Sequence, residues 1–243
     1  MTGKMHLENK ENCQDLVWQS LSDRFSCITM ADGAGTASFA EKGACLAVET
    51  VKSFLEQKGP DIFTMEVEDL KKAILLLLRQ QFTEACQENR CGMIDLSTTL
   101  LFFATDGEHY VAANIGDGLV GRIAQDGEEE VILQQDLGRF VNETYFITDA
   151  DSERHFHITI GDFDSGSTYF LLTDGSCDCL CNSRPPLFAP LMHKFVRWLK
   201  EYPFEEVNTA LGTMMYKLFP NRTDDDCAIA MLKMEDDGSS ETT

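Results

Sequence analysis

Positive charge is scarce in this 243-residue chain, which has 20 Lys and Arg residues against 41 Asp and Glu residues and a net charge of −21 at pH 7. Proteins that bind nucleic acid use clustered Lys and Arg side chains to neutralise phosphates. The shortage of cations therefore argues against a nucleic-acid partner.

Long apolar runs are also lacking. The longest run of branched aliphatic residues covers only residues 74–78, far short of the ~20 residues that a membrane-spanning helix requires. The first fifteen residues are polar and contain no apolar segment of the signal-peptide type. We therefore expect a cytoplasmic protein with no membrane partner.

Metal-binding pairs of the CxxC or HxxxH type are missing, and the nine cysteines form no disulfide framework. Cys177, Cys179 and Cys181 alternate, which would place three thiols on one side of an extended strand. Zinc sites need further ligands elsewhere. We interpret these residues as free thiols in a partly buried loop of a protein from a reducing compartment, and their role stays open.

No Gly-, Pro- or Ser-rich linker divides the chain, and 43% of its residues are hydrophobic, enough for a core. The sequence predicts one domain over residues 1–234 and an acidic, disordered tail at 235–243.

Helical and strand patterns occur in separate blocks. Helical spacing predicts helices at 38–57, with a Ser38 and Glu41 capping box, and at 67–89, 190–201 and 204–218. Strands are predicted at 25–31, 98–104, 109–115, 119–124, 130–133, 156–160, 168–173 and 227–233. Tight primed turns at Asp106-Gly107 and Asp126-Gly127 would make a four-stranded meander of the strands between 98 and 133. The pattern predicts an α+β fold with antiparallel sheets packed together and helices outside.

Three further Asp-Gly pairs differ from these hairpin turns because Asp32, Asp117 and Asp174 each end an apolar strand. Strand ends can converge at one rim of a sheet, where buried carboxylates are costly unless they meet positive charge. An acidic run at 224–226 precedes the last strand, and no Lys or Arg occurs between Arg222 and Lys233. Hard divalent cations with oxygen ligands, Mg²⁺ or Mn²⁺, are the simplest counter-ions.

The same motifs, in order, resemble those of the PPM family, the metal-dependent type 2C protein serine/threonine phosphatases. They are N-C-Q-D at 12–15, A-D-G-A-G at 31–35, S-T-T at 97–99, A-A-N-I-G-D-G at 112–118, T-Y-F-L-L-T-D-G at 168–175 and D-D-C-A-I at 225–229. The segment V-N-E-T-Y-F-I-T at 141–148 resembles the bacterial branch.

The resemblance implies a four-layer αββα sandwich, in which two antiparallel β-sheets are flanked by helix pairs. It also implies two Mg²⁺ or Mn²⁺ ions that activate a water molecule to hydrolyse phosphomonoesters. By position in the motifs, the metal-site residues would be Asp32, Gly33, Asp174, Asp225, Asp15, Gln14 and, for a third and weaker ion, Asp117. Asp32, Asp174 and Asp225 would carry catalysis, and Lys10 would bind the substrate phosphate.

Three departures from the family pattern accompany the resemblance. Ala34 stands where some members carry a His that protonates the leaving group, Lys10 stands where many carry an Arg, and Gly118 replaces a Ser. The expected partners are a phosphoprotein substrate and, as a candidate, a cognate kinase in trans. Two alternatives stay open: a catalytically silent regulator that binds a phosphoprotein, and a hydrolase of a small phosphate ester.

Overall fold

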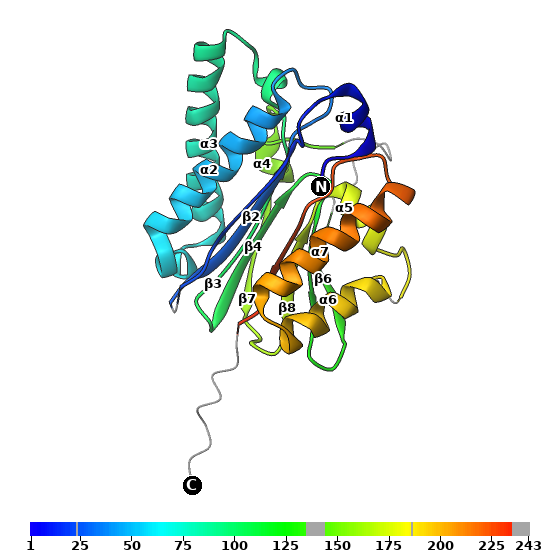
Figure 1. Cartoon of the computed structure of the whole chain (residues 1–243). Coiled ribbons are helices and arrows are strands. Elements are labelled where there is room, and N and C mark those ends of the chain that lie inside the picture. The colour runs from blue at the N-terminus through cyan, green and yellow to red at the C-terminus, as the bar shows by residue number, and fades with distance from the viewer. Residues whose placement is uncertain (23, 135–143, 186, 235–243) are drawn as a thin grey trace.

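The computed structural model describes residues 1–22, 24–134, 144–185 and 187–234 (Figure 1). The predicted tail at 235–243 and the start of the 141–148 segment lie outside these residues. No helix in the described ranges is both long and apolar enough to cross a membrane.

Two antiparallel sheets form the centre of the molecule (Figure 1). The first has the order β1-β2-β3-β4-β7, with β1 Asp15–Ser20, β2 Ser26–Asp32, β3 Leu100–Thr105, β4 His109–Ile115 and β7 His157–Asp162. The second has the order β6-β5-β8-β9, with β5 Leu119–Ile123, β6 Glu129–Leu133, β8 Thr168–Leu172 and β9 Ile229–Leu232.

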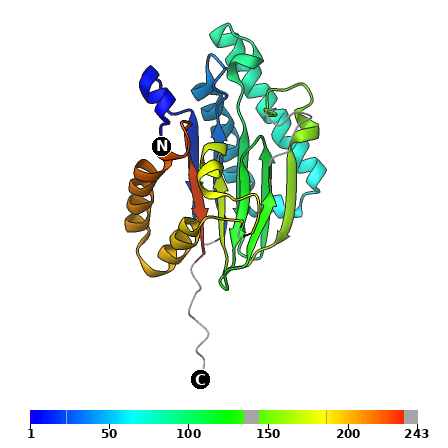
Figure 2. The same ribbon diagram turned by 90° about the vertical axis from the view of Figure 1, so that its right-hand side faces the viewer.

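Two helix pairs cover the outer faces of the stacked sheets (Figure 2). The helices α2 Ala40–Lys58 and α3 Val67–Asn89 lie on the first sheet, and α6 Pro190–Glu201 and α7 Phe204–Leu218 lie on the second. The short helices are α1 Lys4–Asn9, α4 Ser152–His155 and α5 Asp174–Leu180, with 3-10 turns at Gly59–Thr64, Met93–Leu96 and Phe219–Asn221. This arrangement confirms the α+β sandwich of four layers.

The alternation of side chains along each strand explains the layers. On β3, Phe102 packs into the core beneath α2 and α3, whereas Phe103 points into the core between the sheets. Phe103 stacks there on Tyr169 of β8, with ring centroids 4.5 Å apart. Because both faces are buried, the strand sequence reads as a continuous apolar run.

The long helices agree closely with the sequence pattern. The bounds of α3, α6 and α7 are those expected. Of the apolar positions predicted for α3, Leu70, Ile74, Leu78 and Phe82 are buried, whereas Leu77 is exposed. The capping box predicted for α2 is wrong, because this helix begins only at Ala40 and has no side-chain cap. Ser38 instead donates a hydrogen bond to Asp95 Oδ1 at 3.1 Å.

The predicted meander is also wrong, because the chain leaves the first sheet after β4 and enters the second at β5. The crossover consists of Gly116, Asp117 and Gly118. Gly116 has φ +120°, and a Cβ there would lie 2.4 Å from Thr99 Cγ2. A Cβ on Gly118 would lie 2.7 Å from the Leu172 carbonyl oxygen, so a Ser at this position would not fit without a shift.

The β3–β4 hairpin is confirmed, but its turn is not of the tight primed type. Gly107 has φ +92°, whereas the described non-glycine residues with positive φ are Lys10 and Arg90, so Asp106 lacks the second positive φ of such a turn. Asp106 Oδ1 instead accepts hydrogen bonds from the Glu108 and His109 backbone N–H groups at 2.9 and 2.7 Å.

The run of alternating cysteines is helical rather than extended. Cys177 and Cys179 lie in α5, and Cys181 is its C-cap, so the three thiols do not share one face of a strand. All nine cysteines are free. The sequence pattern did not reveal α5, because this helix is only seven residues long and its two cysteines alternate as in a strand.

The crossover glycine should be more sensitive to substitution than a hairpin glycine of similar backbone conformation. Gly127 has φ +93° and no atom within 4 Å of a Cβ built on it, so Gly127→Ala adds strain alone. Gly116→Ala adds the contact with Thr99 as well. We expect losses in unfolding free energy of about 1 kcal/mol for Gly127→Ala and about 2–5 kcal/mol for Gly116→Ala, measured by urea denaturation. Equal losses would contradict the steric argument.

Candidate metal centre

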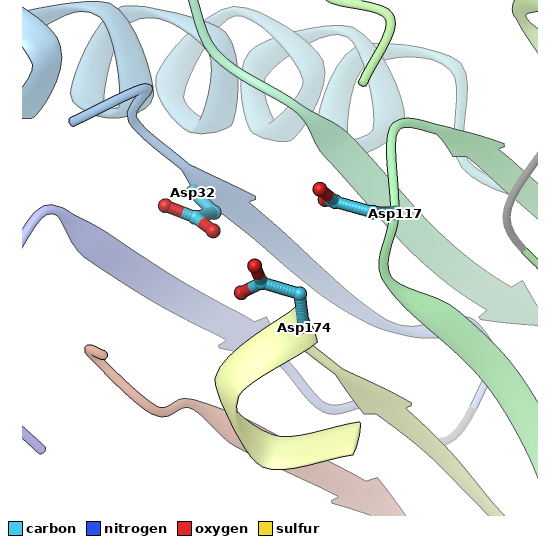
Figure 3. A group of neighbouring side chains, drawn as sticks. All are labelled: Asp32, Asp117 and Asp174. Carbon is cyan, nitrogen blue, oxygen red and sulfur yellow. The ribbon is translucent and has the colours of Figure 1, made fainter. Parts of the chain in front are cut away.

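Three carboxylates from separate elements converge at one rim of the sandwich (Figure 3). Asp32 ends β2, Asp117 lies in the crossover between the sheets, and Asp174 opens α5. One oxygen from each of the three lies within 4.8 Å of the others. The structure thus brings together the three strand-terminal Asp-Gly pairs that the sequence set apart from the hairpin turns.

The three carboxylates line a cavity of ≈ 390 Å³. Three other predicted site residues, Gln14, Gly33 and Asp225, also line it, and so does Ala34. No Lys or Arg among the described residues is part of the lining. The described part of the cavity wall therefore gathers carboxylates without a lysine or arginine to balance their charge.

Backbone and hydroxyl contacts hold Asp32 in place. Its backbone N–H donates to Thr99 Oγ1 at 3.0 Å, and its carbonyl oxygen accepts hydrogen bonds from the Thr98 hydroxyl and the Thr99 N–H, both at 2.8 Å. A Cβ on the next residue, Gly33, would lie 2.4 Å from the Ala40 carbonyl oxygen. The motif S-T-T thus supports the Asp32 backbone, while Gly33 permits the close approach of α2.

Asp15 lies directly opposite Asp32 in the β1–β2 register. Unlike Asp32, Asp15 does not line the cavity. Thr173 Oγ1 donates to Asp15 Oδ2 at 2.8 Å, while the buried Asp15 Oδ1 has no hydrogen-bond partner among the described residues. Gln14 Oε1 is likewise buried and unpartnered. Buried polar atoms rarely lack partners. Two unsatisfied oxygen acceptors beside converging carboxylates fit a site for a hard cation.

Burial and mutual repulsion alter the acidity of these groups. Burial is the main cause that raises the pKa of Asp15 and Asp174 to about 7, and nearby carboxylates contribute. Burial also raises the pKa of Asp32 well above its ordinary value and, more modestly, that of Asp117. Without a cation, the folded chain therefore reduces its repulsion by binding protons.

Two predicted residues lie at the margin of this group. Asp225 is exposed and lines the cavity but does not belong to the close group of three carboxylates. Lys10 follows α1 with φ 61° and lines a neighbouring groove together with Gln14 and Lys42, not the carboxylate cavity. Its predicted contact with a substrate phosphate stays a prediction.

Sequence reasoning missed two residues that line the cavity. The Thr144 hydroxyl donates a hydrogen bond to Asp117 Oδ2. Thr144 lies in the 141–148 segment, whose sequence alone does not predict this contact. His6 also lines the cavity, and no sequence signal could pair it with Asp226, 220 positions further along the chain.

The raised carboxyl pKa values predict an unusual pH dependence of stability. An unfolded Asp has a pKa of about 3.9, so between about pH 4 and 7 the folded chain retains protons that the unfolded chain has lost. The metal-free protein should therefore be most stable at the acidic end of this window and lose stability as pH rises through it. We expect the melting temperature of the metal-free protein to fall as the pH rises from about 5 to about 8. Mn²⁺ should raise the melting temperature more at pH 8 than at pH 5, because protons compete with the metal for the carboxylates. A metal-free melting temperature that rises with pH would contradict this.

Comparison with known proteins gives concordant results. The protein phosphatase 2C family pattern matches residues 2–215. Serine/threonine-protein phosphatase 3 of Escherichia coli (strain K12) is 27% identical over 158 residues, which are 62% of this chain and 61% of that relative. The chain thus matches less than two thirds of the relative's length.

Two solved structures share the fold at lower identity. RsbX in complex with magnesium has a TM-score of 0.58 at 14% identity, over 95% of this chain and 90% of that chain. The catalytic domain of the serine threonine protein phosphatase PstP, in complex with two manganese ions, has a TM-score of 0.60 at 18% identity, over 90% of both chains. With the family pattern matched over most of its length, the chain belongs to the protein phosphatase 2C family.

Proposed function

We propose that this protein is a metal-dependent protein serine/threonine phosphatase, a hydrolase of phosphomonoesters on phosphoproteins. The observation that carries the proposal is the convergence of Asp32, Asp117 and Asp174 in one cavity of a family member. The proposed location is the cytoplasm, with a cognate kinase in trans as a candidate partner.

The proposed cofactors are two Mg²⁺ or Mn²⁺ ions, held by Asp32, Asp174, Asp225 and the Gly33 carbonyl, with Asp117 serving a third, weaker site. When bound, such ions neutralise phosphoryl oxygens and make water a nucleophile near neutral pH. The buried and unpartnered Asp15 Oδ1 and Gln14 Oε1 support this proposal, because each is an oxygen acceptor that no described residue uses.

The negative charge of the cavity determines how a phosphate ester can bind there. Carboxylates alone would repel a dianionic phosphate, so phosphate binding depends on cations held by these same side chains. Lys10, in the adjoining groove, is the lysine we propose to contact the substrate phosphate. Its ammonium acts as a point charge rather than a bidentate fork.

The methyl group of Ala34 can donate no proton to the leaving alkoxide. The proton must come from water or from another group, and substrates with poor leaving groups should suffer most. p-Nitrophenyl phosphate, which needs no such proton, should therefore be hydrolysed faster than phosphoserine.

The decisive experiment compares two Asp-Gly pairs of opposite expected roles. We expect Mn²⁺-dependent hydrolysis of p-nitrophenyl phosphate that EDTA abolishes and that Asp174→Asn lowers about 100-fold or more, because a cation ligand is lost. Asp106→Asn, at an exposed hairpin turn, keeps an oxygen acceptor for the turn and should leave turnover unchanged. Absence of metal-dependent turnover in the wild-type protein would rule out the enzyme and leave the silent regulator.

A second measurement separates a phosphoprotein substrate from a small phosphate ester. Phosphoserine and phosphothreonine peptides should be hydrolysed with a higher kcat/KM than free phosphoserine, because residues flanking the phosphate can bind outside the cavity. A preference for the free ester would instead favour the small-ester hydrolase.

A further inference from the structure

A buried carboxylate that the predicted metal site does not use lies beside it. Asp226 is 2% exposed and lies between Asp225 and the last strand, β9. Its Oδ1 accepts a hydrogen bond from the Gly3 N–H at 2.6 Å, and its Oδ2 accepts one from the Gln14 N–H at 2.6 Å. Charge-assisted hydrogen bonds of this kind are among the strongest in proteins.

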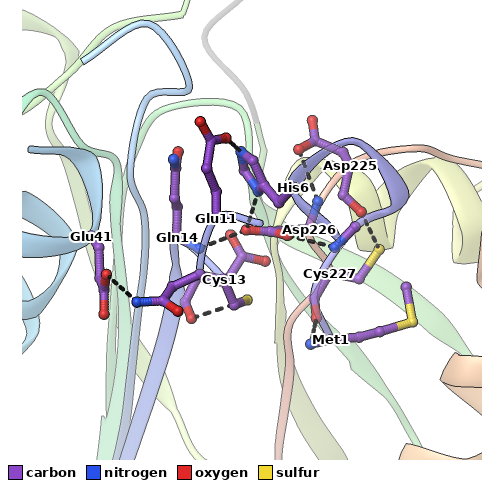
Figure 4. Close-up of polar contacts among 12 residues, drawn as sticks. Met1, His6, Glu11, Cys13, Gln14, Glu41, Asp225, Asp226 and Cys227 are labelled. Atoms are coloured by element: carbon purple, nitrogen blue, oxygen red, sulfur yellow. Dashed lines mark hydrogen bonds and ion pairs between the residues drawn. The ribbon is translucent and has the colours of Figure 1, made fainter. Parts of the chain in front are cut away.

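The third partner of Asp226 is a histidine from the N-terminal helix (Figure 4). His6 is 5% exposed, and its Nδ1 lies 2.9 Å from Asp226 Oδ2. On the other side of the ring, Nε2 lies 3.8 Å from Glu11 Oε2. Since a buried carboxylate is costly without donors, His6 completes the set of partners that allows an Asp at this position.

Backbone contacts keep the N-terminal segment against the loop that carries Asp225 and Asp226. The Met5 N–H donates to the Asp224 carbonyl oxygen at 3.2 Å, and the Cys227 N–H donates to the Met1 carbonyl oxygen at 2.9 Å. Met5 and His6 thereby form part of the wall of the carboxylate cavity.

Asp226 joins three segments that carry predicted metal-site residues. Its side chain binds the Gln14 backbone, immediately before Asp15. Its own N–H donates to Asp225 Oδ1 at 2.8 Å. A Cβ on Gly175, the residue after Asp174, would lie 2.1 Å from the Asp226 carbonyl oxygen, so α5 packs directly on this residue. A shift of Asp226 would therefore disturb Gln14, Asp225 and the start of α5 together.

We propose that the His6–Asp226 pair is a positioning unit that holds Gln14, Asp225 and the start of α5 in the arrangement that binds the divalent cation. This inference rests on the divalent-cation site of the proposed function. It assigns a role to α1, which contains none of the Asp-Gly motifs. Residues that support metal ligands typically contribute 10- to 100-fold to metal affinity.

Two substitutions at position 6 separate the hydrogen bond from packing. His6→Phe keeps an aromatic ring but has no donor for Asp226. His6→Asn places an amide N–H near the position of Nδ1 and retains the donor. His193→Phe is the matched control, because His193 Nε2 lies 2.6 Å from Glu129 Oε1 in a similar pair on the second sheet, outside the cavity lining.

Calorimetric titration with Mn²⁺ gives a readout that does not depend on turnover. We expect His6→Phe to raise the Mn²⁺ dissociation constant about 10-fold, with a parallel rise in the Mn²⁺ concentration for half-maximal hydrolysis of p-nitrophenyl phosphate. His6→Asn should recover most of the wild-type affinity, and His193→Phe should leave the affinity unchanged even if its melting temperature falls.

The outcomes distinguish this inference from the proposed function. Wild-type affinity in folded His6→Phe, or equal losses in His6→Phe and His6→Asn, would overturn the positioning role. If the wild-type protein binds Mn²⁺ without hydrolysing phosphate esters and only His6→Phe weakens binding, the positioning role stands and the proposed function falls. A wild-type protein that binds no Mn²⁺ would overturn both.

Discussion

Electrostatic repulsion among carboxylates at one rim of the sandwich is the constraint on which the rest of the structure depends. Asp15 and Asp32 lie opposite each other on neighbouring strands, and Asp117 and Asp174 approach from two other segments. Like charges in such positions destabilise a sheet, and burial strengthens their repulsion. The buried strands around these residues hold the arrangement in place, and protons or cations can reduce the repulsion.

Among the described residues, threonine hydroxyls rather than basic side chains hold these aspartates in place. Thr98 and Thr99 bind the backbone of Asp32, Thr173 donates to Asp15, and Thr144 donates to Asp117. Uncharged hydroxyl groups hold these residues in place without cancelling the charge of their side chains. A lysine or arginine in their place would form an ion pair and occupy the carboxylates of the proposed metal site.

The predictable part of the fold followed from local periodicity. The spacing of Leu70, Ile74 and Phe82 gave the bounds of α3, and apolar runs ending in Asp-Gly located the three converging carboxylates. Which sheet a strand joins was not encoded in its own residues, so the crossover at Gly116 was mistaken for a continued meander. The contact of His6 with Asp226 was also inaccessible, because it depends on two segments that meet only in three dimensions.

The contact between the first residues and the loop at 224–227 has a consequence for synthesis on the ribosome. Every strand of the first sheet is made before Asp225 and Asp226 emerge, yet Gln14 depends on Asp226 for its backbone partner. Contacts between residues so distant in sequence form late, after the entropy of a long loop has been overcome. The contacts of Asp226 with Gly3 and Gln14 therefore form only after Asp32, Asp117 and Asp174 have all been synthesised.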